Sequence, residues 1–334
     1  MKLIHALFST VAVLLISSGT ILAADWVIYE GGEGPGKGKH IVFISGDEEY
    51  RSEEALPMLA KILSQRHGFK CTVIFPIDKN SGEINPKEQT NIPGMESIDS
   101  ADLVIAALRF RELPDKDMKH FVDYLTKGKP LIGLRTTTHA FNYTRNKQSP
   151  YAIYSFDSKD WPGGFGQQLL GETWINHHGH HKVESTRGLI DGVHIQHPIL
   201  RGVKDIWGDS DVYGITHLPN EATVLVYGLT LSGMEPTSLP NYDKSIMPII
   251  WLKDYQVPGG KPGVALTSTI GAATDLESAD LRRLIVNATY WFTGLADKID
   301  GKANVDYIGE YHPSKFSFDG HKTGIKPADH ELKN

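Results

Sequence analysis

Cysteine is nearly absent from this chain, which has one cysteine, Cys71, among 334 residues. A single cysteine excludes a disulfide within the chain. Cys71 begins the apolar run 71–75, which has the composition of a buried strand. We therefore expect a thiol in the hydrophobic core rather than a catalytic nucleophile.

The chain also has no excess of basic residues. Its formal net charge is −6, and 22% of its residues are charged. Nucleic-acid-binding proteins usually carry a basic patch or stripe, so we predict no nucleic-acid partner. The hydrophobic content of 40% is ordinary for a globular protein. The length allows one large α/β domain with insertions or two small domains.

No apolar run after the N-terminus approaches the ~20 residues that span a membrane. At the N-terminus, Lys2 and His5 precede the apolar run 11–16, and small residues at 23–24 follow as a cleavage region. This arrangement predicts a signal peptide over residues 1–24 that is cleaved on export. We expect a periplasmic or secreted protein with no membrane contact after cleavage. An uncleaved N-terminal anchor is the alternative.

Several familiar catalytic motifs are missing as well. The chain has no GxSxG nucleophile elbow and no GxxxxGK[ST] phosphate loop, and its early glycines precede the first predicted strand instead of following it as GxGxxG. HExxH and CxxC metal motifs are also absent. A dinucleotide site is therefore not expected, and no cofactor is indicated with certainty.

The apolar segments that are present follow one another in the order of an α/β protein. Strand-like runs alternate with helical stripes, and helices are expected to begin near Ser52, Pro114 and Ser278. The runs are apolar throughout rather than alternating, which favours an open, mostly parallel sheet with helices on both faces. The predicted strands cover residues 40–45, 70–75, 102–107, 130–134, 223–227, 248–252 and 263–269.

This pattern divides the mature chain into three regions. Residues 25–39 are rich in glycine and are expected to be a flexible lead-in. Residues 40–297 form the predicted α/β domain, with an insertion over residues 142–172. The tail over residues 298–334 has no periodicity but keeps several aromatic residues, so we expect it to be ordered against the domain in part.

Polar residues follow three of the predicted strands at the point where each strand ends. Ligands of open α/β sheets bind outside the carboxyl ends of parallel strands, so these residues are expected to meet at one edge of the sheet. They would bring carboxylates, guanidinium groups and an imidazole together. The residues are Asp47 and Glu48 after the first strand, Arg109 and Arg111 after the third, and Arg135, Thr136 and His139 after the fourth.

A cluster of histidines follows Trp174, over residues 177–181. If this segment is extended, His178 and His180 point to the same side of the chain. Such a pair of imidazoles could hold a divalent metal such as zinc, or could transfer protons near neutral pH. The same histidines could instead simply form hydrogen bonds with their neighbours. The residues leave these three interpretations open.

Four of these segments together resemble ThuA-like proteins, a family named for trehalose utilisation, and in particular its exported bacterial members. The resemblance spans residues 39–297 and implies a flavodoxin-like sheet similar to that of class I glutamine amidotransferases. It also implies a role in carbohydrate metabolism, on oxidised (keto) sugars. The segments are KHIVFISGDEEYR (39–51), LIGLRTTTHAF (131–141), GGFGQQLLGETWINHHGHH (163–181) and HPILRGVKDIW (197–207), and the segment 268–295 also fits the exported members.

The sequence departs from its relatives at two points. Amidotransferases carry a nucleophilic cysteine after a central strand, where this chain has residues 135–138, RTTT. Glutaminase chemistry is therefore not expected. Many ThuA-like proteins carry Leu-Gly-His near the C-terminal strand, where this chain has residues 270–272, IGA, so that histidine is missing. His139 matches the family's histidine after the fourth strand.

The leading hypothesis is a periplasmic enzyme that acts on a sugar or keto-sugar by acid–base chemistry, and hydrolysis, isomerisation and elimination fit its residues equally. One alternative is a carbohydrate-binding or scaffold protein without catalysis, and another is a metal-dependent hydrolase. For the enzyme and for the binding protein, the expected partner is a small carbohydrate. The oligomeric state stays open. The assignments are His139, His178, His180, Asp47 and Glu48 to catalysis, Arg109, Arg111, Arg135, Thr136 and Trp174 to substrate binding, and His178 and His180 to a metal.

Overall fold

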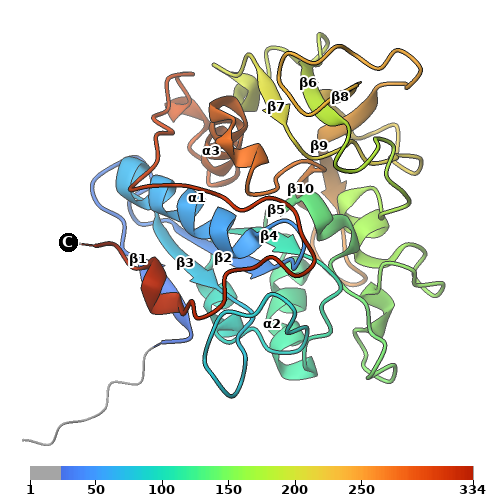
Figure 1. The fold of residues 1–334 in the computed structure, drawn as a ribbon. Coiled ribbons are helices and arrows are strands. Elements are labelled where there is room, and N and C mark those ends of the chain that lie inside the picture. The colour runs from blue at the N-terminus through green and yellow to red at the C-terminus, as the bar shows by residue number, and fades with distance from the viewer. Residues whose placement is uncertain (1–23, 334) are drawn as a thin grey trace, which may run out of the picture.

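In a computed structural model that describes residues 24–333, the chain forms one ten-stranded sheet flanked by helices (Figure 1). The expected signal peptide, except for its last residue, lies outside the described residues. The strands are β1 (Trp26–Tyr29), β2 (His40–Gly46), β3 (Lys70–Ile74), β4 (Leu103–Leu108), β5 (Leu131–Leu134), β6 (Ser185–Ile190), β7 (Ile206–Gly208), β8 (Thr223–Leu231), β9 (Met247–Tyr255) and β10 (Gly263–Ser268). The α-helices are α1 (Ser52–His67), α2 (Asp115–Thr126) and α3 (Ala279–Phe292).

The strands lie in the order β1-β3-β2-β4-β5-β10-β9-β8-β6-β7. Neighbours from β3 to β10 in this order are parallel, whereas β1 and the strands beyond β10 pair antiparallel. Taken in chain order, the five parallel strands are arranged 2-1-3-4-5, which is the flavodoxin-like arrangement. The predicted open α/β sheet is confirmed, and its antiparallel half extends it on one side.

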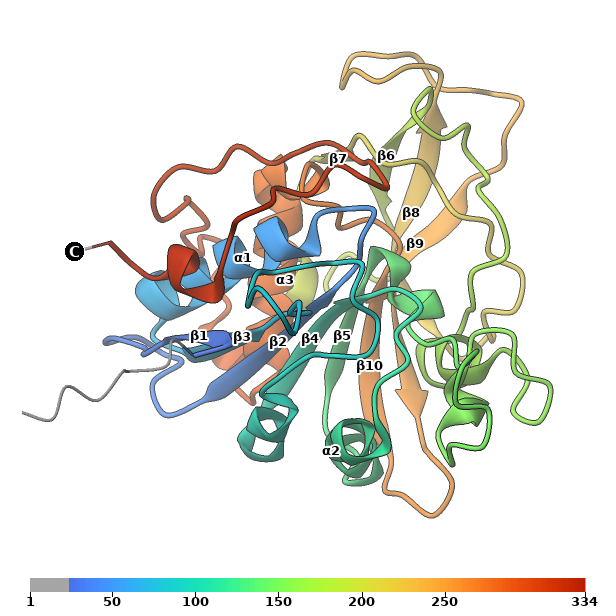
Figure 2. The ribbon, with the colours of Figure 1, turned by 60° about the horizontal axis from the view of Figure 1, so that its bottom comes forward.

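Helices cover both faces of the parallel strands, as Figure 2 shows for α1 and α3 on one side and α2 on the other. Alternate residues of β2 therefore enter different cores. Ile41 and Phe43 pack in the core with α1 and α3. Val42 and Ile44 pack in the core with α2. Burial on both faces explains why this strand is apolar along its whole length.

Local signals position the turn between β2 and α1. Arg51 has a left-handed φ of 60° directly before the helix, and Gly68 ends the helix with a φ of 80°. The Ser52 hydroxyl accepts hydrogen bonds from the backbone N–H groups of Gly46 (3.2 Å) and Asp47 (3.0 Å). These bonds close the turn tightly and hold the acidic residues after β2 at the edge of the sheet.

Two regions differ from the expectations. Residues 25–39, expected to be a flexible lead-in, include β1, which pairs antiparallel with β3 at one edge of the sheet. The strands β6 and β7 were not expected. Strand β7 has three residues and β6 contains Gly188, so neither produces a long apolar run. Strand β6 pairs with β8, and β7 pairs with β6 at the edge of the sheet, so the sheet rather than the local pattern of residues decides where both strands form.

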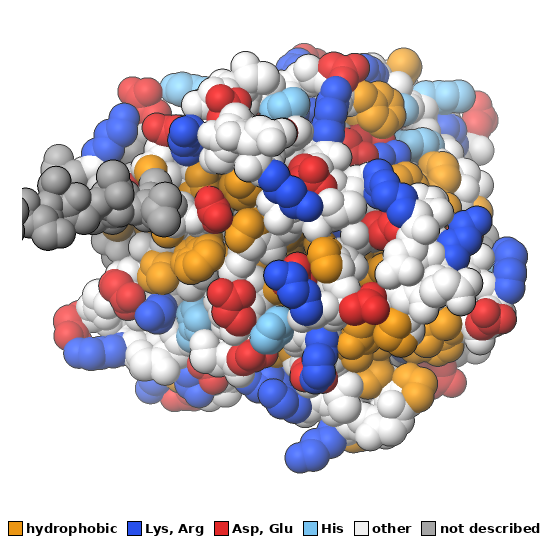
Figure 3. Space-filling model, turned by 90° about the horizontal axis from the view of Figure 1, so that it is seen from below, with side chains coloured by type: hydrophobic (Ala, Val, Ile, Leu, Met, Phe, Trp, Pro, Cys, Tyr) orange, Lys and Arg blue, Asp and Glu red, His pale blue; other side chains and the backbone are white. Residues whose placement is uncertain are grey.

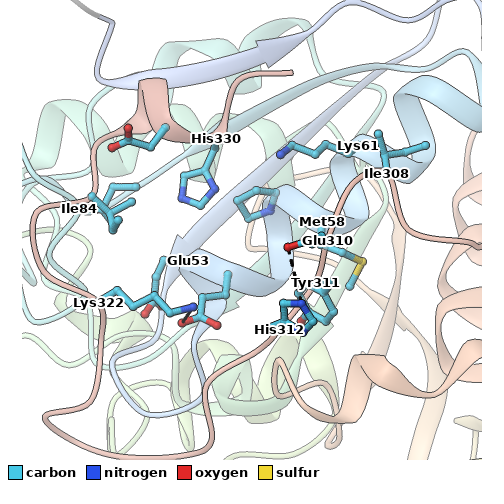
Figure 4. A pocket seen from close by; sticks show the side chains of 14 residues that line it. Glu53, Met58, Lys61, Ile84, Ile308, Glu310, Tyr311, His312, Lys322 and His330 are labelled. Atoms are coloured by element: carbon cyan, nitrogen blue, oxygen red, sulfur yellow. Dashed lines mark ion pairs between the residues drawn. The ribbon is translucent and has the colours of Figure 1, made fainter. Parts of the chain in front are cut away.

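The C-terminal tail crosses the molecule beside α1 and returns to β1 (Figures 1 and 2). The His330 ring stacks on Phe75 with 5.4 Å between ring centroids, and the Tyr29 hydroxyl donates to the carbonyl of His330 at 2.7 Å. A cavity of about 220 Å³ remains between α1 and the tail (Figure 4). Glu53 and Lys61 of α1 line it opposite His330. The tail is thus ordered against the domain over much of its length.

No helix within residues 24–333 combines the length and the apolar character needed to cross a bilayer. The face in Figure 3 carries acidic and basic side chains interspersed, with apolar patches between them. On this face no sign of charge dominates.

Candidate active site

The predicted convergence of the loops after β2, β4 and β5 is present at the switch point of the parallel sheet. Asp47 lies at its centre and is buried. One oxygen of its carboxylate accepts the backbone N–H of Glu49 at 2.7 Å, and the other accepts the hydroxyl of Thr136 at 2.7 Å. Asp47 and Thr136 therefore connect the loop after β2 to the loop after β5. The polar atoms of both side chains are used in hydrogen bonds within the protein.

Glu48 forms ion pairs with both arginines of the second loop. Its Oε1 contacts Arg109, and its Oε2 lies 2.9 Å from Nη2 of Arg111. The Arg111 side chain is fully buried and also donates to the carbonyls of Pro86 (2.9 Å) and Glu88 (2.8 Å). Its donors are thus occupied, so the prediction that Arg111 binds substrate is corrected to a structural role.

Arg109 remains partly accessible at the same edge. It pairs with Glu49 at 3.0 Å and lies over the ring of Phe110 at 4.2 Å. Burial, and then the nearby Asp47 carboxylate, raise the pKa of Glu49 to about 7, against the lowering effect of Arg109. Glu49, one of the carboxylates that follow the first predicted strand, therefore changes its charge near neutral pH.

Arg135 is held between two aromatic rings at the end of β5. Its guanidinium carbon lies 4.5 Å from the ring centroid of Tyr50 and 3.8 Å from that of Tyr213. It donates to the carbonyls of Asp211 and Thr269 at 2.7 Å each, and to Oδ1 of Asp211 at 2.8 Å. Arg135 is therefore buried and committed to fixing Asp211, which corrects its predicted contact with substrate.

Asp211 also receives two imidazoles from the histidine cluster. Nδ1 of His177 lies 2.7 Å from Oδ2, and Nδ1 of His181 lies 3.0 Å from Oδ1. Burial alone would raise the pKa of Asp211, but Arg135 and the two imidazoles lower it below its usual range. Asp211 is thus a carboxylate that stays ionised while it orients two histidines.

The expected pairing of His178 with His180 is wrong. The segment does not form the extended strand that this prediction assumed, because it bends at residues 178–179 and turns again at 181–183. The Nε2 atom of His178 lies 2.9 Å from the carbonyl of Ser245, and the N–H of His180 donates to Glu184 at 2.6 Å. The bend brings histidines four positions apart together, not two.

His139 is buried beside the same cluster. Its ring lies 5.2 Å from that of Phe110, 5.7 Å from Trp174 and 6.3 Å from Tyr213. Burial, followed by the charges of two arginines and His177, holds the pKa of His139 well below its usual range. The ring is therefore neutral. Trp174, predicted to bind substrate, also lies 5.7 Å from the ring of His177, so it bridges the two histidines.

A pocket of about 350 Å³ opens beside His181. The tail forms one of its walls, because the Phe316 ring packs 4.1 Å from that of His181 and 5.0 Å from that of Tyr50. The N–H of Ser317 donates to the carbonyl of Glu49 at 3.2 Å, and Arg51 donates to the carbonyl of Ser317. The lining residues are Tyr50, His181, Lys182, Asp209, Ser210, Met234, Thr274, Lys315 and Phe316.

Comparisons with known proteins come at the level of structure alone: no family model matches the chain, and no curated protein matches it. Two of the similar solved structures are ThuA-like proteins. One, from Bacteroides uniformis, is 14% identical with a TM-score of 0.47, covering 78% of this chain and 93% of that one. The other, from Parabacteroides merdae, is 15% identical with a TM-score of 0.46, covering 77% and 90%.

A glutaminase domain of Trypanosoma brucei CTPS, solved with bound acivicin, is also similar, at 10% identity and a TM-score of 0.36, covering 81% of this chain and 98% of that one. In the present chain the loop after β5 contains no cysteine. Cys71 is fully buried on β3, as its apolar surroundings predicted. The roles of the residues at this site are therefore inferred from the geometry of the site itself.

The cluster of His177, His181 and Asp211 has the ligand types of a zinc site, and the three ligand atoms lie within 4.8 Å of one another. However, Oδ1 of Asp211 already accepts hydrogen bonds from Arg135 and His181, and Oδ2 accepts one from His177. A metal would have to replace these donors. As arranged, the carboxylate instead holds each Nδ1–H and leaves Nε2 as the basic atom.

The two imidazoles differ in access. The side chain of His177 is 35% exposed, whereas Nε2 of His181 is buried without a hydrogen-bond partner among the described residues. His177 is therefore the imidazole that a molecule at this edge could reach. The spacing of His177 and His181 was visible in the sequence, but Asp211, Tyr213 and Tyr50 carry no local motif that could have revealed them.

Proposed function

We propose that the chain is an exported enzyme that transfers protons on a sugar or sugar-derived ketone, with His177 as the acid–base group. The observation that carries this proposal is the 2.7 Å contact between Nδ1 of His177 and Oδ2 of the buried Asp211. A carboxylate in this position fixes the tautomer of the ring and stabilises the imidazolium that forms when Nε2 takes a proton. A positioned imidazole of this kind contributes about 10²–10⁴ in rate.

The surroundings of His177 suit this role. Arg135 keeps Asp211 ionised, so the carboxylate that holds Nδ1 of His177 carries its negative charge at neutral pH. His139 is neutral and adds no competing positive charge beside His177. Trp174 lies against both rings. In this proposal, His139 is a positioning residue that acts through Trp174 and Tyr213, and it does not touch the substrate.

The substrate class is supported by the residues around the cluster. Aromatic rings of Tyr50, Phe316 and Trp174 offer apolar faces on which the C–H face of a sugar ring can pack, and hydroxyls of Ser210 and Thr274 lie in the adjoining pocket. Removal of a proton next to a carbonyl requires one base, which His177 supplies. Isomerisation and elimination begin with this step, so we favour them over hydrolysis.

The test is proton exchange in D₂O, followed by NMR, with trehalose-like disaccharides and their keto derivatives. The wild-type protein should exchange the proton next to the carbonyl and form a product. His177→Ala should lower the rate at least 100-fold. His178→Ala is the matched control, because its ring contacts the carbonyl of Ser245 and not Asp211, and it should retain the wild-type rate. Sugar binding by the wild type without exchange or turnover would support the non-catalytic alternative instead.

A metal-dependent hydrolase is the second candidate, and the ligand set of His177, His181 and Asp211 favours it. If it is correct, protein purified without a histidine tag contains zinc in a 1:1 ratio, and His181→Ala loses it. Chelation should then abolish turnover, and added zinc should restore it. A zinc content near zero, with turnover that is insensitive to chelators, would exclude this candidate and leave the acid–base proposal.

A further inference from the structure

The pocket beside His181 has a positive lining in a protein of net charge −6. Lys182 and Lys315 contribute two ammonium groups to it, and neither forms an ion pair with any residue that the structure describes. Asp209 is the one acidic residue of the lining, and its carboxylate accepts the hydroxyl of Thr274 at 2.5 Å. The pocket thus offers two ammonium groups that form no ion pair within the described part of the chain.

Lys182 is held in place by the backbone. It has a left-handed φ of 61°, which is uncommon and costly for a residue with a side chain. The turn around it is closed by hydrogen bonds to the carbonyl of His180 from the N–H groups of Val183 (3.0 Å) and Glu184 (2.8 Å). The strained turn directs Lys182 to the rim of the pocket, where its Nζ lies 4.7 Å from the ring centroid of Phe316.

The aromatic wall completes the pocket. Phe316 packs against both His181 and Tyr50, and Met234 adds a further apolar surface to the lining. A volume of about 350 Å³ is near the lower end for small-molecule sites, which fits a monosaccharide unit rather than a long oligosaccharide. An aromatic wall beside ammonium groups suits a molecule with one apolar ring face and one anionic substituent.

We infer that this pocket binds an anionic sugar of monosaccharide size, with Phe316 packing on the sugar ring and Lys182 and Lys315 pairing with the anionic group. The inference rests on the proposed function in one respect, since it assigns the pocket to the substrate of His177. The His177 ring lies 4.9 Å from that of His181, which lines the pocket, so a bound sugar would lie next to the proposed base. The tail therefore supplies two specificity-determining residues, Lys315 and Phe316.

The experiment measures binding to the full mature chain by calorimetry, with glucuronate, glucose 6-phosphate and glucose as probes. At least one of the anionic probes should bind tenfold or more tightly than glucose, and the better of the two identifies the anion as a carboxylate or a phosphate. The preference should weaken several-fold between low and high salt, because ions screen exposed charges. Equal binding of glucose and both anions, or no binding of any probe, would overturn the inference.

Variants then test the residues. The double variant Lys182→Gln, Lys315→Gln should lower the affinity for the anionic sugar at least tenfold and leave that for glucose unchanged. Phe316→Ala should weaken the binding of charged and neutral sugars alike. Lys79→Gln, an exposed lysine outside the pocket, is the matched control and should bind as the wild type does. Wild-type affinity in the double variant, with folding verified by circular dichroism, would contradict the inference.

Binding and turnover separate this inference from the proposed function. If the anionic sugar binds as expected but is not exchanged or converted, the proposed enzymatic role fails and the binding site remains. If neutral keto-sugars are converted through His177 while both lysines can be replaced without effect, the anion preference fails and the enzymatic role remains.

Discussion

The Nδ1 atom of His177 lies 2.7 Å from Oδ2 of Asp211, although the two residues are 34 positions apart in the chain. The contact joins the histidine cluster to the segment between β7 and β8. Arg135, at the end of β5, donates to the same carboxylate. Three parts of the chain therefore meet at one buried negative charge, and the chemistry proposed for His177 depends on it.

Asp211→Asn should impair both stability and turnover. The substitution removes the charge that faces the buried Arg135, and breaking a buried ion pair costs about 3–5 kcal/mol. Proton transfer by His177 should fall about 10²–10⁴-fold, because the ring loses the carboxylate that orients it. Urea unfolding and the exchange rate in D₂O measure the two effects. Asp243→Asn, an exposed acid with no ion pair among the described residues, should change neither.

Arg111→Gln should destabilise the fold without altering substrate affinity. Arg111 is fully buried and pairs with Glu48, so its loss leaves that carboxylate without one of its cations and should cost about 3–5 kcal/mol. Thermal unfolding measures the loss, and KM should stay within twofold of the wild type. A large increase in KM in a variant with native stability would restore Arg111 to the substrate site.

Stability should depend on pH through Glu53, beneath the tail (Figure 4). Burial raises the pKa of Glu53 from its usual 4.5 to about 8, so the folded state holds this proton more tightly than the unfolded state does. The stabilisation of the folded state by this bound proton is fully present below about pH 4.5. It is lost as the pH rises toward 8, and the free energy of unfolding falls by up to about 1.4 kcal/mol per pH unit. Glu53→Gln should therefore gain stability relative to the wild type between pH 5 and pH 8 in urea unfolding.

The control for this prediction is Glu310→Gln. Glu310 lines the same cavity, but its side chain is 91% exposed, so its substitution should leave the pH dependence of unfolding unchanged. If Glu53→Gln and the wild type differ equally at pH 5 and pH 8, the raised pKa is refuted.

Phe316→Ala should expose His181. In the wild type the Phe316 ring packs 4.1 Å from the imidazole, and Nε2 of His181 is buried. Removing the ring should increase the rate at which diethyl pyrocarbonate modifies His181 several-fold, as measured by peptide mass spectrometry. His178, which does not contact Phe316, is the internal reference. An unchanged ratio of the two rates would mean that the tail does not shield the site.

The elements of the parallel sheet could be predicted from the sequence because their signals are local. Strand β2 is apolar on both faces, and the glycine at 68 ends α1 where the pattern indicates. The edge at which Asp47, Arg109 and Arg135 meet follows from parallel strands alone. The pairing of His178 with His180 was predicted wrongly because the residues of this segment carry no local signal that distinguishes an extended backbone from a bent one.

By itself, the sequence determined the strands of the parallel core, the starts and ends of the main helices and the polar loops that follow them, because each depends on neighbours a few positions away. Only the tertiary structure decided that Asp211 joins His177 to Arg135, that Arg111 is structural and that Phe316 covers His181. These contacts link residues separated by tens to more than a hundred positions. Their formation depends on the order of the strands and the path of the tail, which no local pattern of residues specifies.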